Sequence, residues 1–329
     1  MPLRVLVTGA TGCVGANIVE ALLDNGYTVR ALRRASSRLD ALTGLEPAFV
    51  VGDVTDYDSL AAAMAGCQLV FHAAAISQYW RNSRELLYRV NVEGTRNVLR
   101  AAQSQGVERV IFTSSVAVLG VPTRPGQQLD ETASFNLSPR RFPYGHSKVL
   151  AEAEVQRAVA AGLDAVIVNP VSVIGQRDVY FVGGEILRMA TQGRLRVAPP
   201  GGMGVVSARA VGLGHLLAAE RGVTGERYLL NGENLSHRAL LEIVAEVTGA
   251  RPPQWVAPRP LMGIAAALVD VWNRLRRRPP LVEGNQLRLS AREMYFDGSK
   301  ARQELDFAPI PARAAVEEAW RWYRQQGML

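Results

Sequence analysis

The sequence predicts an α/β protein with a doubly wound parallel sheet and a smaller, irregular C-terminal domain. In the first 175 residues, short apolar runs alternate with segments of helical periodicity, which is the pattern of strands joined by helices. The apolar runs are continuous rather than alternating, which indicates strands buried on both faces, as in a parallel sheet. Beyond about residue 176 this alternation loosens, and the pairs Pro199-Pro200, Pro252-Pro253 and Pro279-Pro280 divide the chain into short pieces.

Strands and helices are expected to alternate along the first part. The strands are predicted at residues 3–8, 27–32, 47–53, 68–75, 107–115 and 164–170. The intervening helices are predicted at residues 13–25, 57–64, about 85–105 and 144–161. In the second part, helical periodicity predicts helices at residues 213–220, 239–248, 260–278 and 314–325.

The composition excludes several classes of protein. Of the 329 residues, 48% are hydrophobic and 20% are charged, which is too apolar for a disordered chain. The 37 basic residues are all arginine except Lys148 and Lys300, and they exceed the 30 acidic residues to give a net charge of +7. No nucleic-acid motif accompanies the one tight basic cluster, which comprises Arg274 and residues 276–278. We therefore expect a charge that is spread over the surface, and no binding to nucleic acid.

The sequence also predicts a cytoplasmic protein without a metal site. Cys13 and Cys67 are too few for a disulfide framework or a four-ligand zinc site, and we expect small core residues in a reducing compartment. The glycine-rich turn at residue 9 comes too early for the apolar core of a signal peptide. The longest apolar run, residues 261–269, falls short of the roughly 18–20 residues of a membrane span. The stretch 260–278 has a basic end and could lie on an anionic membrane surface, but packing inside the second domain is favoured.

A glycine-rich turn follows the first predicted strand and opens a helix, in the order Gly9-Ala10-Thr11-Gly12-Cys13-Val14-Gly15. Glycines allow a tight turn and the close approach of a pyrophosphate, and the helix N-terminus presents N–H groups and a positive dipole to that anion. At the end of the first strand of a βαβ unit, this pattern predicts a Rossmann-type dinucleotide-binding domain.

The residues after the second strand favour NADP(H) over NAD(H). An acidic residue at this place holds the ribose 2′-hydroxyl of NAD, whereas an arginine accommodates the 2′-phosphate of NADP. Here the segment Arg33-Arg34-Ala35-Ser36-Ser37-Arg38 has no acidic residue before Asp40. The alternative, that these arginines only solvate a surface loop of an arginine-rich chain, stays open.

Two further strand ends offer positions for the dinucleotide. Asp53 and Val54 follow the third strand, where they can meet an adenine edge, although Asp53 could equally cap the next helix. The small residues of the run Ala73-Ala74-Ala75 follow His72 and leave room for a flat ring and a ribose. His72 itself is expected to be a structural histidine.

The segment Tyr144-Gly145-His146-Ser147-Lys148 carries the predicted chemistry. Tyr144 and Lys148 are four residues apart at a helix start, so both side chains lie on one face. An adjacent ammonium is expected to lower the pKa of the Tyr144 phenol, which makes this residue a candidate general acid–base for an alcohol–carbonyl pair. Lys148 can also hold the nicotinamide ribose.

Other polar and aromatic residues could complete the site. Ser115 follows the fifth strand at the ligand-binding edge of the sheet, where its hydroxyl can orient a substrate oxygen. Asn91 could join a proton relay or be an ordinary polar residue of the long helix. Tyr79 and Trp80 could wall the substrate site or pack within their own loop.

Six motifs in this order resemble the extended short-chain dehydrogenase/reductase family, within the NAD-dependent epimerase/dehydratase superfamily. They are TGATGCVG (8–15), GDVTD (52–56), FHAAA (71–75), NVEGT (91–95), FTSS (112–115) and YGHSK (144–148). The likeness is strongest to the branch that resembles dihydroflavonol 4-reductase, which includes proteins labelled hopanoid-associated sugar epimerases.

This resemblance implies roles for individual residues. The catalytic set would be Ser115, Tyr144 and Lys148, and Arg34 falls at the position of the 2′-phosphate arginine. The implied cofactor-binding residues are Gly9, Thr11, Gly12, Cys13, Val14, Gly15, Arg33, Arg34, Asp53, Val54, Ala73, Ala74, Ala75, Tyr144, Lys148, Pro170 and Val173. Residues 1–175 with about 204–225 would form the NADP-binding domain, and about 176–203 with 226–329 the substrate-binding domain.

Some positions depart from the family's pattern. Sugar-nucleotide epimerases usually have asparagine where this chain has Ser172, and an acidic residue where it has Arg33, which weakens a sugar-nucleotide function. Residues 206–210 replace a segment that often resembles His-Val-Asp-Asp, and Cys13 replaces a frequent aromatic residue.

Three functions follow from these residues. The first is an NAD(P)(H)-dependent oxidoreductase that acts on the carbonyl or alcohol of a small, mostly apolar molecule. The second is a nucleotide-sugar epimerase or dehydratase that retains NAD. The third is a silent dinucleotide sensor, which has no need to keep Ser115, Tyr144 and Lys148 together. A homodimer is the expected assembly, since dimers are the commonest soluble oligomers.

Overall fold

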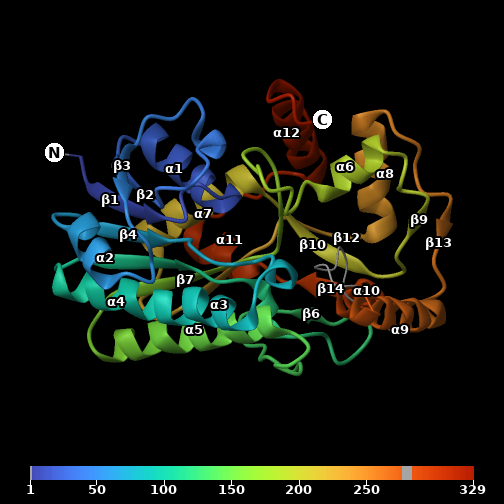
Figure 1. The fold of residues 1–329 in the computed structure, drawn as a ribbon, viewed down its shortest axis with the longest axis horizontal. Coiled ribbons are helices and arrows are strands. Elements are labelled where there is room, and N and C mark those ends of the chain that lie inside the picture. Colours follow the sequence, from blue (N-terminus) through green and yellow to red (C-terminus); the bar gives the residue numbers. More distant parts are fainter. Residues whose placement is uncertain (1, 276–283) are drawn as a thin grey trace.

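The computed structural model describes residues 2–275 and 284–329, and its largest element is a seven-stranded sheet (Figure 1). Its strands are β1 (Arg4–Thr8), β2 (Thr28–Arg33), β3 (Ala48–Val51), β4 (Leu69–His72), β5 (Arg109–Thr113), β7 (Ala165–Pro170) and β11 (Arg227–Leu230). They run in the order β11-β7-β5-β4-β1-β2-β3, and every neighbouring pair is parallel. The order reverses between β1 and β4, which creates the switch point where doubly wound sheets bind ligands. The predicted Rossmann-type sheet is confirmed.

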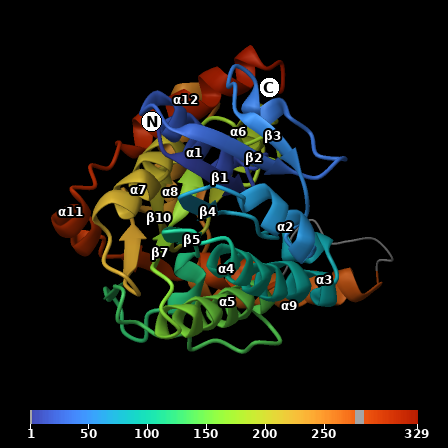
Figure 2. The same ribbon diagram turned by 90° about the vertical axis from the view of Figure 1, so that its left-hand side faces the viewer.

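Helices cover both faces of this sheet (Figure 2). One face carries α1 (Cys13–Asp24) and α7 (Ala208–Arg221), and the other carries α2 (Tyr57–Met64), α4 (Gly94–Ser104) and α5 (Pro143–Ala160). Successive strand residues point to opposite faces, so β1 supplies Val5 and Val7 to one apolar core and Leu6 to the other. Together the two cores bury the central strands, apart from Arg4 and Arg109 at the strand starts.

Two details of the large domain, one in the sheet and one in a helix, differ from the sequence prediction. Burial on both faces is wrong for β3, where Phe49 and Val51 are exposed, because this edge strand has only β2 beside it. The helix predicted at residues 85–105 is divided into α3 (Arg84–Tyr88), one π-helical turn (Arg89–Glu93) and α4.

A second, smaller domain packs beside the carboxyl ends of the large sheet (Figure 1). Its strands are β6 (Gln128–Leu129), β8 (Ser172–Ile174), β10 (Gly202–Ser207), β12 (Glu233–Ser236) and β14 (Glu293–Phe296), with a separate pair of β9 (Val197–Ala198) and β13 (Trp255–Val256). The remaining helices are α6 (Glu185–Thr191), α8 (His237–Thr248), α9 (Arg259–Leu275), α10 (Gly284–Ser290), α11 (Ser299–Leu305) and α12 (Ala312–Gln325). The exact limits of the two domains stay a prediction.

The stretch predicted as a helix at 260–278 forms α9, and only one of its faces packs inward. Met262 and Ala266 are buried, whereas Leu268 and Trp272 are exposed. Residues 276–278 of the basic cluster lie outside the described residues. Within residues 2–275 and 284–329, no helix has both the length and the apolar character to cross a membrane.

Candidate functional site

The glycine-rich turn is shaped by contacts that only glycine allows at two of its three positions. Gly9 has a φ of +68°, and a Cβ there would lie 2.6 Å from the amide nitrogen of Ala74. A Cβ on Gly15 would lie 2.1 Å from the carbonyl oxygen of Gly9. The turn therefore packs α1 directly against the ends of β1 and β4.

Gly12 is different, because the protein itself does not need a glycine there. A Cβ on Gly12 would meet only the carbonyl oxygen of Gly9, at 3.5 Å, which is an ordinary van der Waals distance. Gly12 is also the N-cap residue of α1, and no side chain caps that helix end. Open space beside uncapped N–H groups fits the close approach of a pyrophosphate, so this turn suits a dinucleotide.

The end of β2 presents cations and no available carboxylate. Arg33 is the last residue of β2, and its Nε is buried without a hydrogen-bond partner in the described structure. Arg34 is exposed in the loop that follows, where its backbone N–H donates to the Ser37 hydroxyl. The first carboxylate beyond the strand, Asp40, is already paired with Arg38 at 3.0 Å. A buried guanidinium N–H with no acceptor is a donor that an anionic ligand could satisfy.

Asp53 does not cap a helix, contrary to the alternative that the sequence left open. Its Oδ1 accepts hydrogen bonds from the backbone N–H and the hydroxyl of Thr55, both at 2.8 Å. Asp56 is the N-cap of α2, because its carboxylate accepts from the N–H groups of Asp58 and Ser59. Asp53 thus stays at the carboxyl edge of the sheet beside the buried Val54.

His72 is a structural residue, as the sequence predicted. Its Nδ1 lies 2.7 Å from the Thr8 hydroxyl and its Nε2 lies 3.0 Å from the Thr95 hydroxyl. Burial lowers its pKa from 6.5 to about 3, and the Lys148 charge acts in the same direction. The neutral ring fastens β4 to β1 and α4, and so fixes the start of the run Ala73-Ala74-Ala75.

Ser115 and Tyr144 are brought together from distant parts of the sequence. Ser115 follows β5 and caps a short 3₁₀ turn, where its hydroxyl accepts from the N–H of Ala117 at 3.2 Å. The Ser115 hydroxyl also hydrogen-bonds to the phenol of Tyr144 in the first turn of α5. Gly145 permits this approach, because a Cβ there would lie 2.7 Å from the carbonyl oxygen of Ala117.

Lys148 is buried one helical turn beyond Tyr144. Its Nζ donates to the carbonyl oxygen of Thr113 at 2.7 Å and lies 4.7 Å from the centre of the Phe112 ring. Burial lowers the pKa of Lys148 to about 8, although the charge of Glu152 acts to raise it. A buried cation thus lies under the carboxyl end of β5, where the other candidate catalytic groups meet.

The predicted lowering of the Tyr144 pKa by Lys148 is wrong for the protein alone. Burial raises the pKa of Tyr144 above 10, and only the hydrogen bond from Ser115 opposes this shift. The Lys148 ammonium is directed to the Thr113 carbonyl and the Phe112 ring, so it is already engaged by other groups. The neutral phenol is therefore favoured, which suits a group that donates a proton.

The side chain of Asn91 hydrogen-bonds mainly to backbone groups and does not form an open proton relay. In the π-helical turn, its Oδ1 accepts from the Ile76 N–H at 2.8 Å and its Nδ2 donates to the Ile76 carbonyl at 3.1 Å. Nδ2 also donates to the buried Ser147 hydroxyl at 3.0 Å, and that hydroxyl donates to the Tyr144 carbonyl. Asn91 therefore connects the loop after β4 to the first turn of α5.

Two residues that support the candidate site were not predicted from the sequence. Asn169 in β7 donates from Nδ2 to the backbone carbonyl of Ser115 at 3.1 Å and to Glu152 at 2.8 Å. Both side chains are buried. The available signal was an asparagine that interrupts the apolar run of the sixth predicted strand, next to Pro170.

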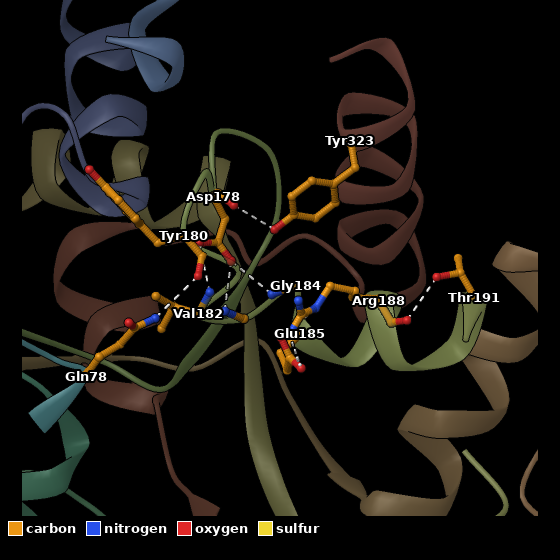
Figure 3. Close-up of polar contacts among 10 residues, drawn as sticks. Gln78, Asp178, Tyr180, Val182, Gly184, Glu185, Arg188, Thr191 and Tyr323 are labelled. Carbon is orange, nitrogen blue, oxygen red and sulfur yellow. Dashed lines mark hydrogen bonds and ion pairs between the residues drawn. The ribbon is translucent and has the colours of Figure 1, made fainter. Parts of the chain in front are cut away.

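The segment after β8 forms a loop whose backbone is held by the side chain of Asp178 (Figure 3). The carboxylate of Asp178 accepts from the N–H groups of Val182, Gly183 and Gly184, and its carbonyl accepts from the hydroxyl of Tyr323 at 2.9 Å. On the other side of the loop, Cys13 Sγ lies 3.6 Å from the carbonyl oxygen of Gln176. The loop thus links α12 of the smaller domain to the start of α1.

The remaining predicted residues lie around this edge. Pro170 ends β7, and Val173 in β8 pairs with Val206 in β10. Trp80 is half-buried in a 3₁₀ turn after β4, and the side chain of Tyr79 lies outside the described part of the structure. Next to them, Gln78 donates to the Tyr180 carbonyl at 3.3 Å, so this loop touches the Asp178 loop (Figure 3).

A parallel sheet of this order, with a glycine-rich turn after its first strand, defines the class of Rossmann-type dinucleotide-binding proteins. The model of the NAD-dependent epimerase/dehydratase family matches residues 5–198. The chain belongs to this family, which is an extended short-chain dehydrogenase/reductase family.

Relatives of known name match nearly the whole chain. A Synechocystis protein named "Putative dihydroflavonol 4-reductase" is 41% identical over 98% of this chain and 95% of its own length. The "Sterol demethylase protein B" of Methylococcus capsulatus is 37% identical over 98% of this chain and 99% of its own length. The crystal structure of gox2253 superposes with a TM-score of 0.87 at 36% identity, covering 99% of both chains.

Proposed function

We propose that this protein is an NADP(H)-dependent oxidoreductase that reduces a carbonyl group, or oxidises the corresponding alcohol, on a small and mostly apolar molecule. The observation that carries the proposal is the hydrogen bond between Ser115 and Tyr144 at the carboxyl edge of the sheet, with Lys148 buried one turn further along α5. The hydroxyls of Ser115 and Tyr144 can bind a carbonyl oxygen and protonate it. The buried Lys148 and the glycine-rich turn, whose helix end is uncapped, lie at the same edge of the sheet.

Each of the three residues has one chemical task in this proposal. The hydroxyl of Ser115 donates a hydrogen bond that orients the substrate oxygen. The neutral Tyr144 phenol gives its proton to that oxygen as the carbonyl carbon gains a hydride, and the products are an alcohol and the oxidised cofactor. When bound, the reduced nicotinamide supplies the hydride. Lys148 has two further N–H donors besides the one that binds the Thr113 carbonyl, and with these it holds the nicotinamide ribose.

A preference for NADP(H) follows from the end of β2. The buried Nε of Arg33 has no acceptor in the described structure, and Arg34 is exposed beside it. Asp40 is occupied by Arg38, so no carboxylate is available there for a ribose 2′-hydroxyl. A 2′-phosphate would place negative charge against these cations, whereas the 2′-hydroxyl of NAD is neutral and would form only a weaker hydrogen bond with them.

An apolar substrate is supported by the relatives and by one departure in the site. The names of two relatives refer to a flavonoid reductase and to sterol demethylation, both of which imply substrates with fused or linked rings. Ser172, which stands where sugar-nucleotide epimerases usually have asparagine, lies in β8 at the same edge. A ring ketone or a secondary alcohol on such a skeleton is the substrate class that we propose.

The second candidate is a nucleotide-sugar epimerase or dehydratase with retained NAD, which the breadth of the family favours. Arg33 and Ser172 weigh against it, for the reasons given above. A silent sensor is disfavoured, since such a protein would have no reason to keep a serine, a tyrosine and a lysine in this arrangement.

Assembly and location complete the proposal. We propose a cytoplasmic homodimer, in which residues 1–175 with about 204–225 bind the cofactor and the remainder binds the substrate. Light scattering coupled to gel filtration tests the oligomeric state.

The decisive experiment for this function is transfer of deuterium from 4-deuterated NADPH to a panel of steroid and flavonoid ketones. We expect deuterium at the carbinol carbon of the product, and loss of transfer in Ser115→Ala and Tyr144→Phe. Tyr57→Phe is the matched control, because its hydroxyl donates to Ser104, the last residue of α4. Conversion of a nucleotide sugar without net oxidation of added cofactor, and no transfer to any ketone, would instead establish the second candidate.

A further inference from the structure

Helix α9 of the smaller domain exposes a continuous apolar stripe. Its six members recur at helical spacing and are between 54% and 76% exposed: Leu261, Ile264, Leu268, Val271, Trp272 and Leu275. The opposite face packs inward through Met262 and Ala266, against α10. Exposed large apolar residues are common singly, but a stripe along four turns indicates a surface that is covered by a partner.

The stripe carries no negative charge of its own. The only acidic residue of α9 is Asp270, and its carboxylate is paired with Arg288 at 2.8 Å. Arg259 at the helix start is cationic and exposed, and it pairs with Glu293 at 2.9 Å. The protein as a whole has a net charge of +7. A negatively charged or neutral surface can therefore approach α9 without electrostatic repulsion. This is the condition for contact with anionic lipid headgroups.

Further apolar residues are exposed in the segment that comes just before the helix. Trp255 is 71% exposed in β13, which comes just before α9, and Val256 and its neighbour Val197 in β9 are exposed as well. Tryptophan is enriched where protein meets the boundary between water and hydrocarbon, because its ring is amphipathic. With Trp255 and Trp272 exposed, α9 and the segment before it have the composition of an interfacial segment rather than of a protein core.

The α9–α10 pair also lies next to the start of α5, the helix that carries Tyr144 and Lys148. Asn285 of α10 donates from Nδ2 to the carbonyl oxygen of Arg141 at 2.9 Å, and Arg141 comes just before α5. Tyr144 is in the first turn of α5, so the exposed stripe belongs to a unit that is hydrogen-bonded to the edge of the proposed site. A partner on this stripe would therefore lie on a unit that contacts the segment just before Tyr144.

We infer that α9 docks on a lipid surface, half-submerged along the stripe, and that this protein takes its apolar substrate from the membrane. The source of the substrate rests on the proposed function, whereas the docking itself does not. A lipid surface accounts for the two exposed tryptophans, for the net positive charge of the chain and for the hydrogen bond that joins α10 to the segment before α5. A second copy of the chain would bring two molecules together that each carry a net charge of +7.

The test is flotation of the full-length protein with vesicles of phosphatidylcholine, alone or mixed with phosphatidylglycerol, without cofactor or substrate. We expect binding to both compositions, with tighter binding to the anionic one. Leu268→Glu puts a charge in the middle of the stripe and should weaken binding about tenfold or more. Ile264→Gln should weaken it in the same direction. Val223→Glu is the matched control, since Val223 is equally exposed in a loop of the large domain and should bind as the unaltered protein does.

Three outcomes would overturn the inference. They are failure of the unaltered protein to float, equal flotation of Leu268→Glu, and a dimer that Leu268→Glu converts to a monomer without any vesicle binding. Hydride transfer to a water-soluble ketone, measured without vesicles, tests the proposed function separately. An active enzyme that does not float contradicts only the docking, and a floating protein without hydride transfer contradicts only the function.

Discussion

The ammonium group of Lys148 donates a hydrogen bond to the carbonyl oxygen of Thr113, with 2.7 Å between the two atoms. This contact joins helix α5 to the last residue of strand β5, just before Ser115. It thereby fixes the distance between the element that carries Tyr144 and the element that carries its hydrogen-bond partner. The arrangement has an electrostatic cost, because burial lowers the pKa of Lys148 from 10.5 to about 8.

The first prediction concerns stability and pH. Above pH 8 the folded protein releases a proton that the unfolded chain keeps up to pH 10.5, so this lysine makes the free energy of unfolding rise with pH across that window. Below it, the buried charge destabilises the fold. Lys148→Met should therefore be more stable than the unaltered protein at neutral pH, by about 1–3 kcal/mol once the lost hydrogen bond is deducted.

Urea unfolding at neutral pH and near the upper end of the window measures this difference, which should shrink as the pH rises. Lys300→Met is the matched control, since Lys300 pairs with Glu226 at 2.6 Å outside the site and should show no such gain. A Lys148→Met variant that is less stable at both pH values would show that burial of the cation has no net cost.

The second prediction is that Tyr144→Phe lowers kcat by about 10²–10⁴-fold, the usual contribution of a positioned general acid. The phenyl ring keeps the packing of α5, so the Kd for the dinucleotide should change less than about threefold. Steady-state kinetics and calorimetric titration measure the two quantities on the same preparation. Turnover at an unaltered rate would mean that another group supplies the proton.

The third prediction separates two glycines of one turn. Gly15→Ala should destabilise the protein strongly, because its Cβ would lie 2.1 Å from the Gly9 carbonyl oxygen. Gly12→Ala should fold normally, because its Cβ has only a 3.5 Å contact, but should bind dinucleotide about tenfold or more weakly if the pyrophosphate occupies this space. Melting curves and calorimetry distinguish the two effects, and full affinity in Gly12→Ala would place the cofactor elsewhere.

The fourth prediction concerns cofactor choice. Arg33→Ala and Arg34→Ala should weaken NADPH binding about tenfold or more, with little change for NADH, since only NADPH has the 2′-phosphate. Arg38→Ala is the control from the same loop, because Arg38 is paired with Asp40. Equal losses for both cofactors would exclude a contact with the 2′-phosphate.

Much of the large domain could be predicted from the sequence, because continuous apolar runs and helical periodicity reflect burial directly. Helix α2 has the predicted limits, and β7 and α5 begin within one residue of theirs. The structural role of His72 also followed from its place at the end of a buried strand, and its bonds to Thr8 and Thr95 account for it.

The features that could not be predicted depend on contacts between distant residues. The exposure of β3 depends on which strand ends the sheet, and the π-helical turn is held by Asn91, which bonds the Ile76 backbone and Ser147. The Tyr144 pKa depends on burial more than on the lysine four residues away. The loop around Asp178 has no sequence signal, because its three N–H donors are gathered only when the chain turns back toward α12.

The measurement that tests the central claim most directly is the nucleotide content of the purified protein. The protein is denatured, any released nucleotide is identified, and the emptied protein is then titrated with NADPH and NADH. A reductase that exchanges its cofactor should yield little bound nucleotide and prefer NADPH. One equivalent of NAD that survives purification would contradict this account, and would establish the retained cofactor of an epimerase or dehydratase.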